Sequence, residues 1–468
     1  MDVHHDDMFS PGRGLAKKTS ATLPQRKVSE DGAAAHRAQM SSSSDSLPSI
    51  KRTAHGGQRP SARSILSLPE TPPGEPKSVF RRASLGTVAQ VKSVGDSLEA
   101  RIDCVMGGKP MSAVLRNDHI ECVMKELAKG PWMVSARKTT KEGRLVRVCS
   151  GPITRDTEES QLLTRLDGQI IEELAARSIS TYPMRPCGKV RDGSPVCDGY
   201  LARLRGSTAI LCLTDGCGWG ARSREASIKA KCGFVEYLDS HIDQCVKGPD
   251  IATTLLRALA AAHCKIIEGK DESSNVGTTT LLGGYVVPLK SAEAFLFLFV
   301  SVGDCKAYLR KGATGKITDL TCDSRSQNRD AKDPGGRIGA YEADRSPDLR
   351  NLSLNSCICE RGDMLILVTD GVSDNLDPTL LGATVFDPMA NKLQWSCQKI
   401  EALLSNAAPK HFLRPVAVVN TLLSHCVTVT QASRDWHESG HLARVPEDST
   451  KFPGKMDHST CMCLMLHE

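Results

Sequence analysis

The sequence has few aromatic residues and no long hydrophobic run. Phe, Trp and Tyr make up only 4% of its 468 residues, so a surface that stacks nucleic-acid bases on aromatic rings is not expected. The longest uninterrupted apolar stretch, Ala294–Val300, is far shorter than the roughly 20 residues that a membrane-spanning helix needs. The first ten residues are polar and acidic, unlike a secretory signal peptide. We therefore expect neither a nucleic-acid partner nor a membrane partner.

The sequence also lacks a strong excess of charge of one sign. Its net charge of +6 comes from 60 basic and 54 acidic residues, which by itself does not indicate a polyanionic partner. Hydrophobic residues make up 40% and charged residues 24%, as in soluble globular proteins, and the length allows up to about three domains. Eighteen cysteines without an export signal are most simply reduced thiols, so we expect a cytoplasmic or nuclear location.

The first 95 residues differ from the rest in composition. They are rich in Ser and Pro and carry an excess of basic residues, with the serine run Ser41–Ser46 and the proline-rich segment Pro69–Pro76. Such a segment buries too little apolar surface to offset the entropy that folding removes. We expect residues 1–95 to form a disordered basic arm.

Within this arm, Ser84 follows two arginines in the sequence FRRASL, Phe80–Leu85. Kinases that select basic residues bind Arg in acidic pockets, so Ser84 is a candidate phosphorylation site. A phosphate would add about −1.5 to −2 of charge and would suit a partner with an Arg-lined site. The alternative is chance, because the arm is rich in both Arg and Ser.

Residues 96–184 form a region to which the sequence assigns no function. Within it, Gln161–Ser178 has apolar residues at helical spacing, although Gly168 weakens the pattern. We therefore expect a partly helical extension. Residues 377–445 are also left without a function, with one helix and a flap expected there.

From residue 185 onward, short apolar strands occur in runs, with amphipathic helices between the runs. This arrangement favours an α+β fold with antiparallel pairing over a parallel α/β sheet. The expected strands are 209–213, 279–287, 294–302, 306–310, 364–368 and 461–466, and the expected helices are 222–242, 249–267 and 396–406.

Asp215, Asp370 and Asp457 each stand at one end of an apolar strand, and glycine follows the first two. Strands hold their backbones rigidly, so carboxylates at strand ends can meet in one cleft. Carboxylate and carbonyl oxygens suit hard divalent ions such as Mg²⁺ or Mn²⁺, and a glycine beside the Asp lets the backbone approach closely. Any single Asp-Gly pair is more often a tight turn than a metal ligand, so only the whole set predicts a metal site.

Eight short motifs follow one another within residues 185–468. They are CDG (Cys197–Gly199), LTDGCGWG (Leu213–Gly220), GTTT (Gly277–Thr280), VGDCKAYLRKG (Val302–Gly312), LTCD (Leu320–Asp323), GGRIG (Gly335–Gly339), GDMLILVTDGVSDNL (Gly362–Leu376) and MDHST (Met456–Thr460). Each motif is weak alone. In this order and at these intervals, the set resembles the metal-dependent PPM (type 2C) Ser/Thr protein phosphatases.

The resemblance implies a four-layer α-β-β-α sandwich, in which helices flank two antiparallel sheets. It also implies metal-dependent hydrolysis of phosphoserine and phosphothreonine on phosphoprotein substrates, with two Mn²⁺ or Mg²⁺ ions and, more weakly, a third. Two such ions lower the pKa of a bridging water and stabilise charge on the phosphoryl oxygens.

The resemblance also assigns roles to individual residues. Asp215 resembles the carboxylate that bridges both metals, with the Gly216 carbonyl on the second. The remaining assignments are Asp370 and Asp457 to the first metal, Asp198 to the second through water, and Asp304 and Asp374 to the third.

The sequence departs from the family pattern at two positions. Cys217 stands where the family has a His, which is implied to be the general acid for the leaving oxygen. A neutral thiol, with an ordinary pKa near 8.5, is a poor substitute, and loss of a general acid typically costs about 10²–10⁴ in rate. The phosphate-binding Arg is also displaced: Arg191 is our candidate, at a longer interval than usual, with Lys189 as the runner-up.

These departures leave two functions open. The first is an active phosphatase that uses the aspartates above. The second is a catalytically weak or inactive protein of the same fold, which acts as a binding or regulatory module. Cys461 and Cys463 alternate on the last strand and are expected in the core, while Trp219 is either a rim residue or ordinary packing.

Overall fold

The computed structural model describes residues 124–125, 146–152, 172–188, 190–270, 275–289, 293–321, 333–341, 345–383, 390–407, 413–441 and 444–467. The expected arm 1–95, with Ser84, lies outside the described residues, and so does Lys189.

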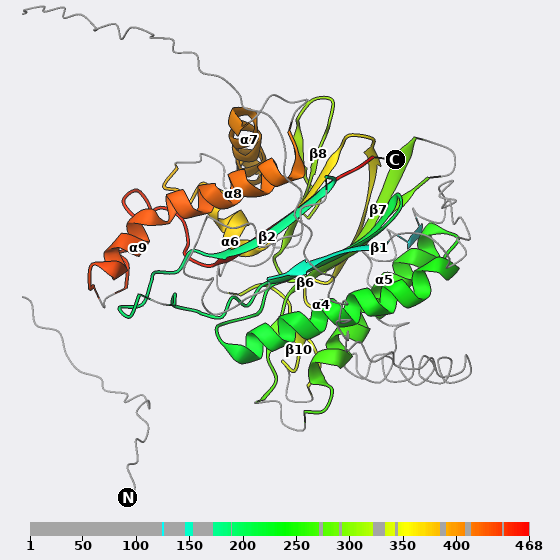
Figure 1. Cartoon of the computed structure of the whole chain (residues 1–468), viewed down its shortest axis with the longest axis horizontal. Coiled ribbons are helices and arrows are strands. Elements are labelled where there is room, and N and C mark those ends of the chain that lie inside the picture. The colour runs from blue at the N-terminus through cyan, green and yellow to red at the C-terminus, as the bar shows by residue number, and fades with distance from the viewer. Residues whose placement is uncertain are drawn as a thin grey trace, which may run out of the picture. The chain divides into compact units, whose positions relative to one another are not determined.

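Two antiparallel sheets form the centre of the described part of the chain (Figure 1). One sheet has the strand order β1-β3-β4-β6-β7-β11 and the other β2-β13-β12-β8-β9. The strands of the first sheet are β1 (Val146–Gly151), β3 (Gly199–Arg205), β4 (Thr208–Thr214), β6 (Leu281–Pro288), β7 (Ala294–Val302) and β11 (Ser353–Glu360). Those of the second are β2 (Leu174–Ser180), β8 (Lys306–Arg310), β9 (Ile317–Asp319), β12 (Met364–Val368) and β13 (His458–Met465), while β5 (Thr278–Thr279) and β10 (Ile338–Gly339) form a separate short ladder.

Helices cover the outer face of each sheet (Figure 1). On the six-stranded sheet, α4 (Ala221–His241) and α5 (Gly248–Ile267) pack together, and 3-10 helix η1 (Ile242–Gln244) joins them. On the five-stranded sheet lie α7 (Ala390–Ala407) and α8 (Pro415–Val429), followed by α9 (Gln431–Glu438). The short helices α6 (Asp370–Ser373) and η3 (Asp374–Leu376) follow β12. None of the described helices is both long and apolar enough to cross a bilayer.

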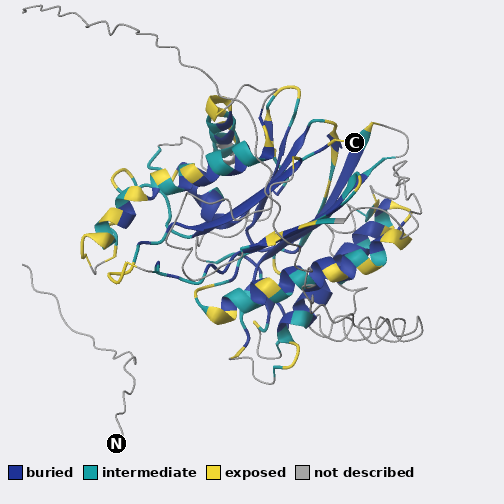
Figure 2. Ribbon diagram, in the orientation of Figure 1, coloured by how far each residue is buried: buried dark blue, intermediate teal, exposed yellow. Residues whose placement is uncertain are grey.

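The buried side chains form three layers of apolar core, one between the sheets and one under each pair of helices (Figure 2). Strand β13 contributes side chains to two of these core layers, because successive side chains of a strand point to opposite faces. Met462 and Leu464 belong to the core between the sheets, whereas Cys461 and Cys463 pack with α8 residues such as Leu422. The expected four-layer α+β sandwich is confirmed, and both cysteines are core residues.

The helix expected over 161–178 is wrong where the structure describes it. Residues Leu174–Ser180 form strand β2, which pairs with β13 along its length, and every residue of β2 is buried. Pairing with a neighbouring strand satisfies the backbone of this segment and overrides its helical spacing. Strands β1 and β2 both belong to the sheets, so the sheets include segments that precede the expected boundary at residue 185. Residues 377–445 contribute α7, α8 and α9.

Candidate active site

Four predicted aspartates come from strand ends of both sheets. Asp198 precedes β3 and Asp215 follows β4, and these neighbouring strands are paired at Gly199 and Thr214. On the other sheet, Asp370 begins α6 soon after β12 and Asp457 immediately precedes β13, where the two strands are paired. Antiparallel pairing therefore places the end of one strand beside the start of the strand paired with it. Together with Asp374, which begins η3, these residues are called the acidic cluster below.

Asp198, Asp370 and Asp457 lie close enough to Asp215 to disfavour its ionisation. Burial raises the pKa of Asp215 well above its ordinary value, and the nearby carboxylates of Asp198, Asp370 and Asp457 raise it further. Like charges held close together disfavour ionisation of each member. A cation bound among these carboxylates would relieve their mutual repulsion.

Asp198 is held by hydroxyl groups of the opposite sheet. Its Oδ2 accepts hydrogen bonds from Thr369 Oγ1 at 2.9 Å and Thr460 Oγ1 at 2.7 Å. Its Oδ1 is buried without a hydrogen-bond partner among the described residues. Burial raises the pKa of Asp198 to about 7, although the hydrogen bonds from the two threonine hydroxyls lower it. The unpaired oxygen suits a bound proton or a cation.

The backbone around Asp215 is fixed by β5 and the residue after it. The Asp215 carbonyl accepts from Thr279 Oγ1 at 2.7 Å and from the Thr280 N–H at 2.8 Å. At Gly216, an added Cβ would lie 2.6 Å from the Ser223 carbonyl oxygen and 2.9 Å from that of Cys197. Only glycine fits this close approach.

Lys455 enters the acidic cluster and was not predicted from the sequence. Its Nζ lies 2.7 Å from Asp370 Oδ2, 3.0 Å from Asp374 Oδ2 and 2.9 Å from Asp457 Oδ2. Burial alone would lower the pKa of Lys455, but the three carboxylates raise it above its ordinary value. The ammonium group is therefore charged and neutralises part of the cluster. The only sequence signal is a lysine two residues before a predicted ligand.

Tyr182 connects Asp457 to the protein surface. The Tyr182 hydroxyl donates to Asp457 Oδ1 at 2.9 Å, and its ring meets that of Trp219 edge-on at 4.9 Å between centroids. Trp219 is 58% exposed and packs on Tyr182. Burial raises the pKa of Asp457 to about 6.

The residues around Cys217 include Asp304. Burial raises the pKa of the Cys217 thiol to about 11, while Arg337 lowers it and the buried Asp304 raises it. The thiol is therefore protonated at neutral pH and is not an activated thiolate.

The Arg191 guanidinium contacts main chain. It is buried, and its Nη1 donates to the Tyr182 carbonyl at 2.5 Å. Burial lowers the pKa of Arg191 to about 10; Arg434 of α9 lowers it further, and Glu438 of the same helix raises it. The structure thus places Arg191 beside α9 charges.

The fit of divalent metals to this site differs between its two halves. In the described ranges, no three His, Cys, Asp or Glu side chains are arranged to hold a metal ion. Asp215, Gly216 and Asp198 offer carboxylate and carbonyl oxygens, and the unpaired Asp198 Oδ1 fits an added cation. At Asp370 and Asp457, the Lys455 ammonium already takes the position between the carboxylates. A second ion does not fit there with Lys455 in place.

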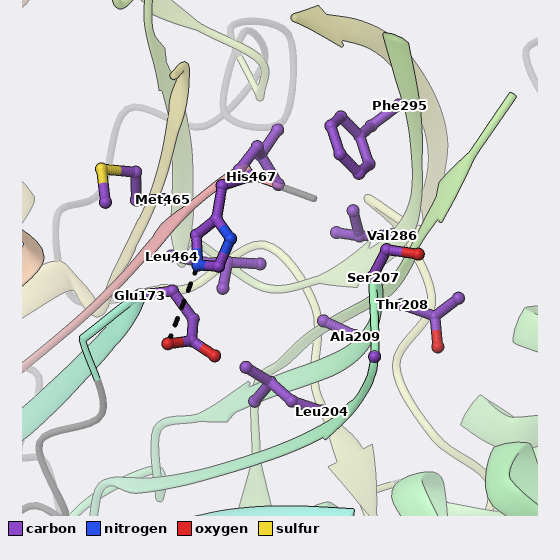
Figure 3. A pocket seen from close by; sticks show the side chains of 12 residues that line it. Glu173, Leu204, Ser207, Thr208, Ala209, Val286, Phe295, Leu464, Met465 and His467 are labelled. Carbon is purple, nitrogen blue, oxygen red and sulfur yellow. Dashed lines mark ion pairs between the residues drawn. The ribbon is translucent and has the colours of Figure 1, made fainter. Parts of the chain in front are cut away.

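A small pocket lies at the opposite end of β3 and β4 from the acidic cluster (Figure 3). Its volume of about 30 Å³ has room for about two water molecules. Glu173 and His467 face each other across it, with 3.8 Å between Glu173 Oε2 and His467 Nε2. The pocket is too small to hold a phosphopeptide.

Comparison with known proteins found no matching family model. A PP2C-like domain-containing protein of Drosophila melanogaster is 30% identical over 212 residues, which are 43% of this chain and 29% of that protein. The chain thus spans less than a third of the length of this curated relative.

Similar solved structures include the photosystem II phosphatase PBCP, with 16% identity, a TM-score of 0.38, and coverage of 63% of this chain and 99% of that one. The serine/threonine phosphatase PstP of Mycobacterium tuberculosis has 16% identity, a TM-score of 0.34, and coverage of 63% and 100%. The ordered motifs and the PP2C-like relative make the chain similar to PPM (type 2C) proteins over part of its length.

Proposed function

We propose that this chain is a protein phosphatase domain that hydrolyses phosphoserine and phosphothreonine on proteins with slow turnover. The observation that supports it is the meeting of Asp198, Asp215, Asp370 and Asp457 from strand ends of both sheets. In this reaction, a water oxygen bonds to phosphorus and the bond to the side-chain oxygen breaks. The products are inorganic phosphate and the free hydroxyl of the substrate.

Asp215, the Gly216 carbonyl and Asp198 are the residues that would hold Mn²⁺ or Mg²⁺. A bound divalent ion supplies an acidified water and positive charge for the phosphoryl oxygens. The chain's own contribution is to fix these ligands. The Thr369 and Thr460 hydroxyls hold Asp198 Oδ2, which leaves Oδ1 available for the ion or for its water.

Slow turnover follows from Cys217, which takes the place of the expected His. Without a general acid, the leaving serine or threonine oxygen must take its proton from solvent. The typical loss from removing such a group is about 10²–10⁴ in rate.

A binding or regulatory module of the same fold is the second candidate, and Lys455 favours it. An ammonium group held by Asp370, Asp374 and Asp457 competes with a divalent ion for these oxygens. Such a domain would bind phosphoproteins or other partners without turnover.

The test is phosphate release from a phosphothreonine peptide by the full chain, with and without millimolar Mn²⁺. We expect Mn²⁺-dependent release in the wild type, a loss of at least about 100-fold in Asp215→Asn, and wild-type release in Asp243→Asn. Asp243 is an exposed aspartate of η1. Asp243→Asn therefore makes the same Asp-to-Asn change outside the acidic cluster. Equal release by wild type and Asp215→Asn would contradict the proposal. Peptide binding without any release would favour the second candidate.

A further inference from the structure

We propose that Lys455 is a built-in cation that occupies the first metal position of the acidic cluster, so that the domain binds at most one divalent ion while Lys455 is in place. The inference rests on the proposed function for its site. Its test measures metal binding, which is separate from hydrolysis.

Three carboxylates from different segments share one ammonium group. Asp370 lies on α6, Asp374 on η3 and Asp457 before β13, and each places one oxygen 2.7 to 3.0 Å from Lys455 Nζ. Asp370 and Asp457 are the two residues that the family resemblance assigns to the first metal. An ammonium group donates three hydrogen bonds, and three carboxylate oxygens accept them here.

A metal ion at the same position would need a different geometry. Mg²⁺–oxygen distances are about 2.0–2.1 Å, so the carboxylates would have to draw in by roughly 0.8 Å. The Lys455 side chain would also have to leave. The ammonium and the metal therefore exclude each other.

The main chain of Lys455 is clamped, which distinguishes it from a mobile surface lysine. Its N–H donates to Asn375 Oδ1 at 2.9 Å, and its carbonyl accepts from Asn375 Nδ2 at 2.9 Å. Asn375 is fully buried and directly follows Asp374. One amide side chain thus fixes Lys455 beside the carboxylates that its ammonium group contacts.

The residue before Lys455 supports the same arrangement. Gly454 has φ +79°, and a Cβ there would lie 2.3 Å from Asn375 Oδ1. Only glycine combines this conformation with this closeness. The turn at Gly454 therefore places the main chain of Lys455 in contact with Asn375.

The charge of Lys455 offsets the repulsion among the carboxylates that surround it. Carboxylates held this close repel one another when they have no counterion. Lys455 supplies the counterion from within the chain, although its side chain remains 31% exposed. Partial exposure gives the ammonium group a path out if the position is taken by another cation.

The experiment counts bound Mn²⁺ by calorimetry and by electron paramagnetic resonance of free Mn²⁺, using the full chain at low millimolar Mn²⁺. The variants are Lys455→Ala, Lys455→Arg and the control Lys451→Ala, whose side chain is 77% exposed. We expect at most one Mn²⁺ per chain for wild type, Lys455→Arg and Lys451→Ala. Lys455→Ala is expected to bind one more ion than wild type.

Two results would overturn the inference: two or more ions bound by the wild type, or no gain in Lys455→Ala. The wild-type count decides the matter even if Lys455→Ala fails to fold. A wild type that binds one ion and releases no phosphate would remove the proposed function and leave this inference standing. A wild type that binds two ions and hydrolyses the peptide would do the reverse.

Discussion

Thr460 Oγ1 lies 2.7 Å from Asp198 Oδ2 and thereby links the two sheets of the sandwich. Thr460 belongs to β13, whereas Asp198 immediately precedes β3 of the other sheet. Hydrogen bonds to a carboxylate are short and roughly twice as strong as neutral ones. The same bond that orients a candidate metal ligand therefore also contributes to the stability of the sandwich.

The first prediction concerns this link. We expect Thr460→Val to lower the free energy of unfolding by about 0.5–3 kcal/mol, with the larger loss above pH 7 where Asp198 is charged, because it removes a buried hydrogen bond to this carboxyl. It also removes the bond between Thr460 and Ser178. Urea denaturation measures the loss. Thr318→Val, at an exposed position of β9, is the control, and equal stability of the two variants would contradict the prediction.

The second prediction concerns the glycine before Lys455. Gly454 and Gly440 both have positive φ, but a Cβ at Gly440 would meet nothing within 4 Å, whereas at Gly454 it would meet Asn375. We expect Gly440→Ala to cost about 1 kcal/mol from conformation alone, and Gly454→Ala to cost clearly more. Chemical denaturation compares the two. A similar cost for both would show that the contact with Asn375 does not constrain the turn.

The third prediction concerns pH and the buried His263 of α5. Its Nδ1 accepts the Gly339 N–H at 3.1 Å, burial lowers its pKa from 6.5 to about 4, and Arg345 adds to the shift. The unfolded chain therefore binds a proton at a higher pH than the folded chain does. The stability that His263 contributes is complete above pH 6.5 and is lost as pH falls toward 4, by up to roughly 1.4 kcal/mol per pH unit.

Unfolding free energies measured between pH 4 and 7 check this prediction. His263→Asn should show a shallower loss than the wild type, because Asn keeps an acceptor but does not titrate in this range. His441→Asn, at an exposed position, should follow the wild type. An unchanged slope in His263→Asn would mean that other groups cause the acid sensitivity.

The fourth prediction concerns the exposed Trp219. Trp is enriched among the residues that carry binding energy when a partner covers them, and Trp219 packs on Tyr182, whose hydroxyl donates to Asp457. We expect Trp219→Ala to raise the KM for a phosphopeptide about fivefold, which is roughly 1 kcal/mol, with little change in kcat. Steady-state kinetics test it, with Ile228→Ala on α4, 38% exposed, as control. A fall in kcat alone would assign Trp219 a different role.

Central strands were predictable from the sequence because most of their residues are apolar. Strands β7, β8 and β12 have the residues expected for them. The apolar runs of β7 and β12 leave little alternative, whereas β8 has a charged residue at each end. Strand β2 lies at an edge and includes Arg177 and two serines. Its structure depends on pairing with β13, nearly 300 residues later in the chain, which no local pattern reports.

The candidate site divides in the same way. Aspartates at the ends of apolar strands can be recognised in the sequence, and the structure brings Asp198, Asp215, Asp370 and Asp457 together. No local sequence pattern predicts the position of Lys455, because that position depends on Asn375, which is 80 residues away. Whether a lysine enters a carboxylate cluster is decided by such distant contacts.

Strand β13 lies between β2 and β12 inside its sheet, although it follows every other described strand in the chain. During synthesis, the five-stranded sheet therefore cannot close until β13 has left the ribosome, and β2 must wait for it without its only strand neighbour. Domains generally fold as units, and unpaired strand edges favour aggregation. The strands of the nascent five-stranded sheet therefore stay incompletely paired until β13 has been made, and Asp457 and Lys455 join the acidic cluster only at that point.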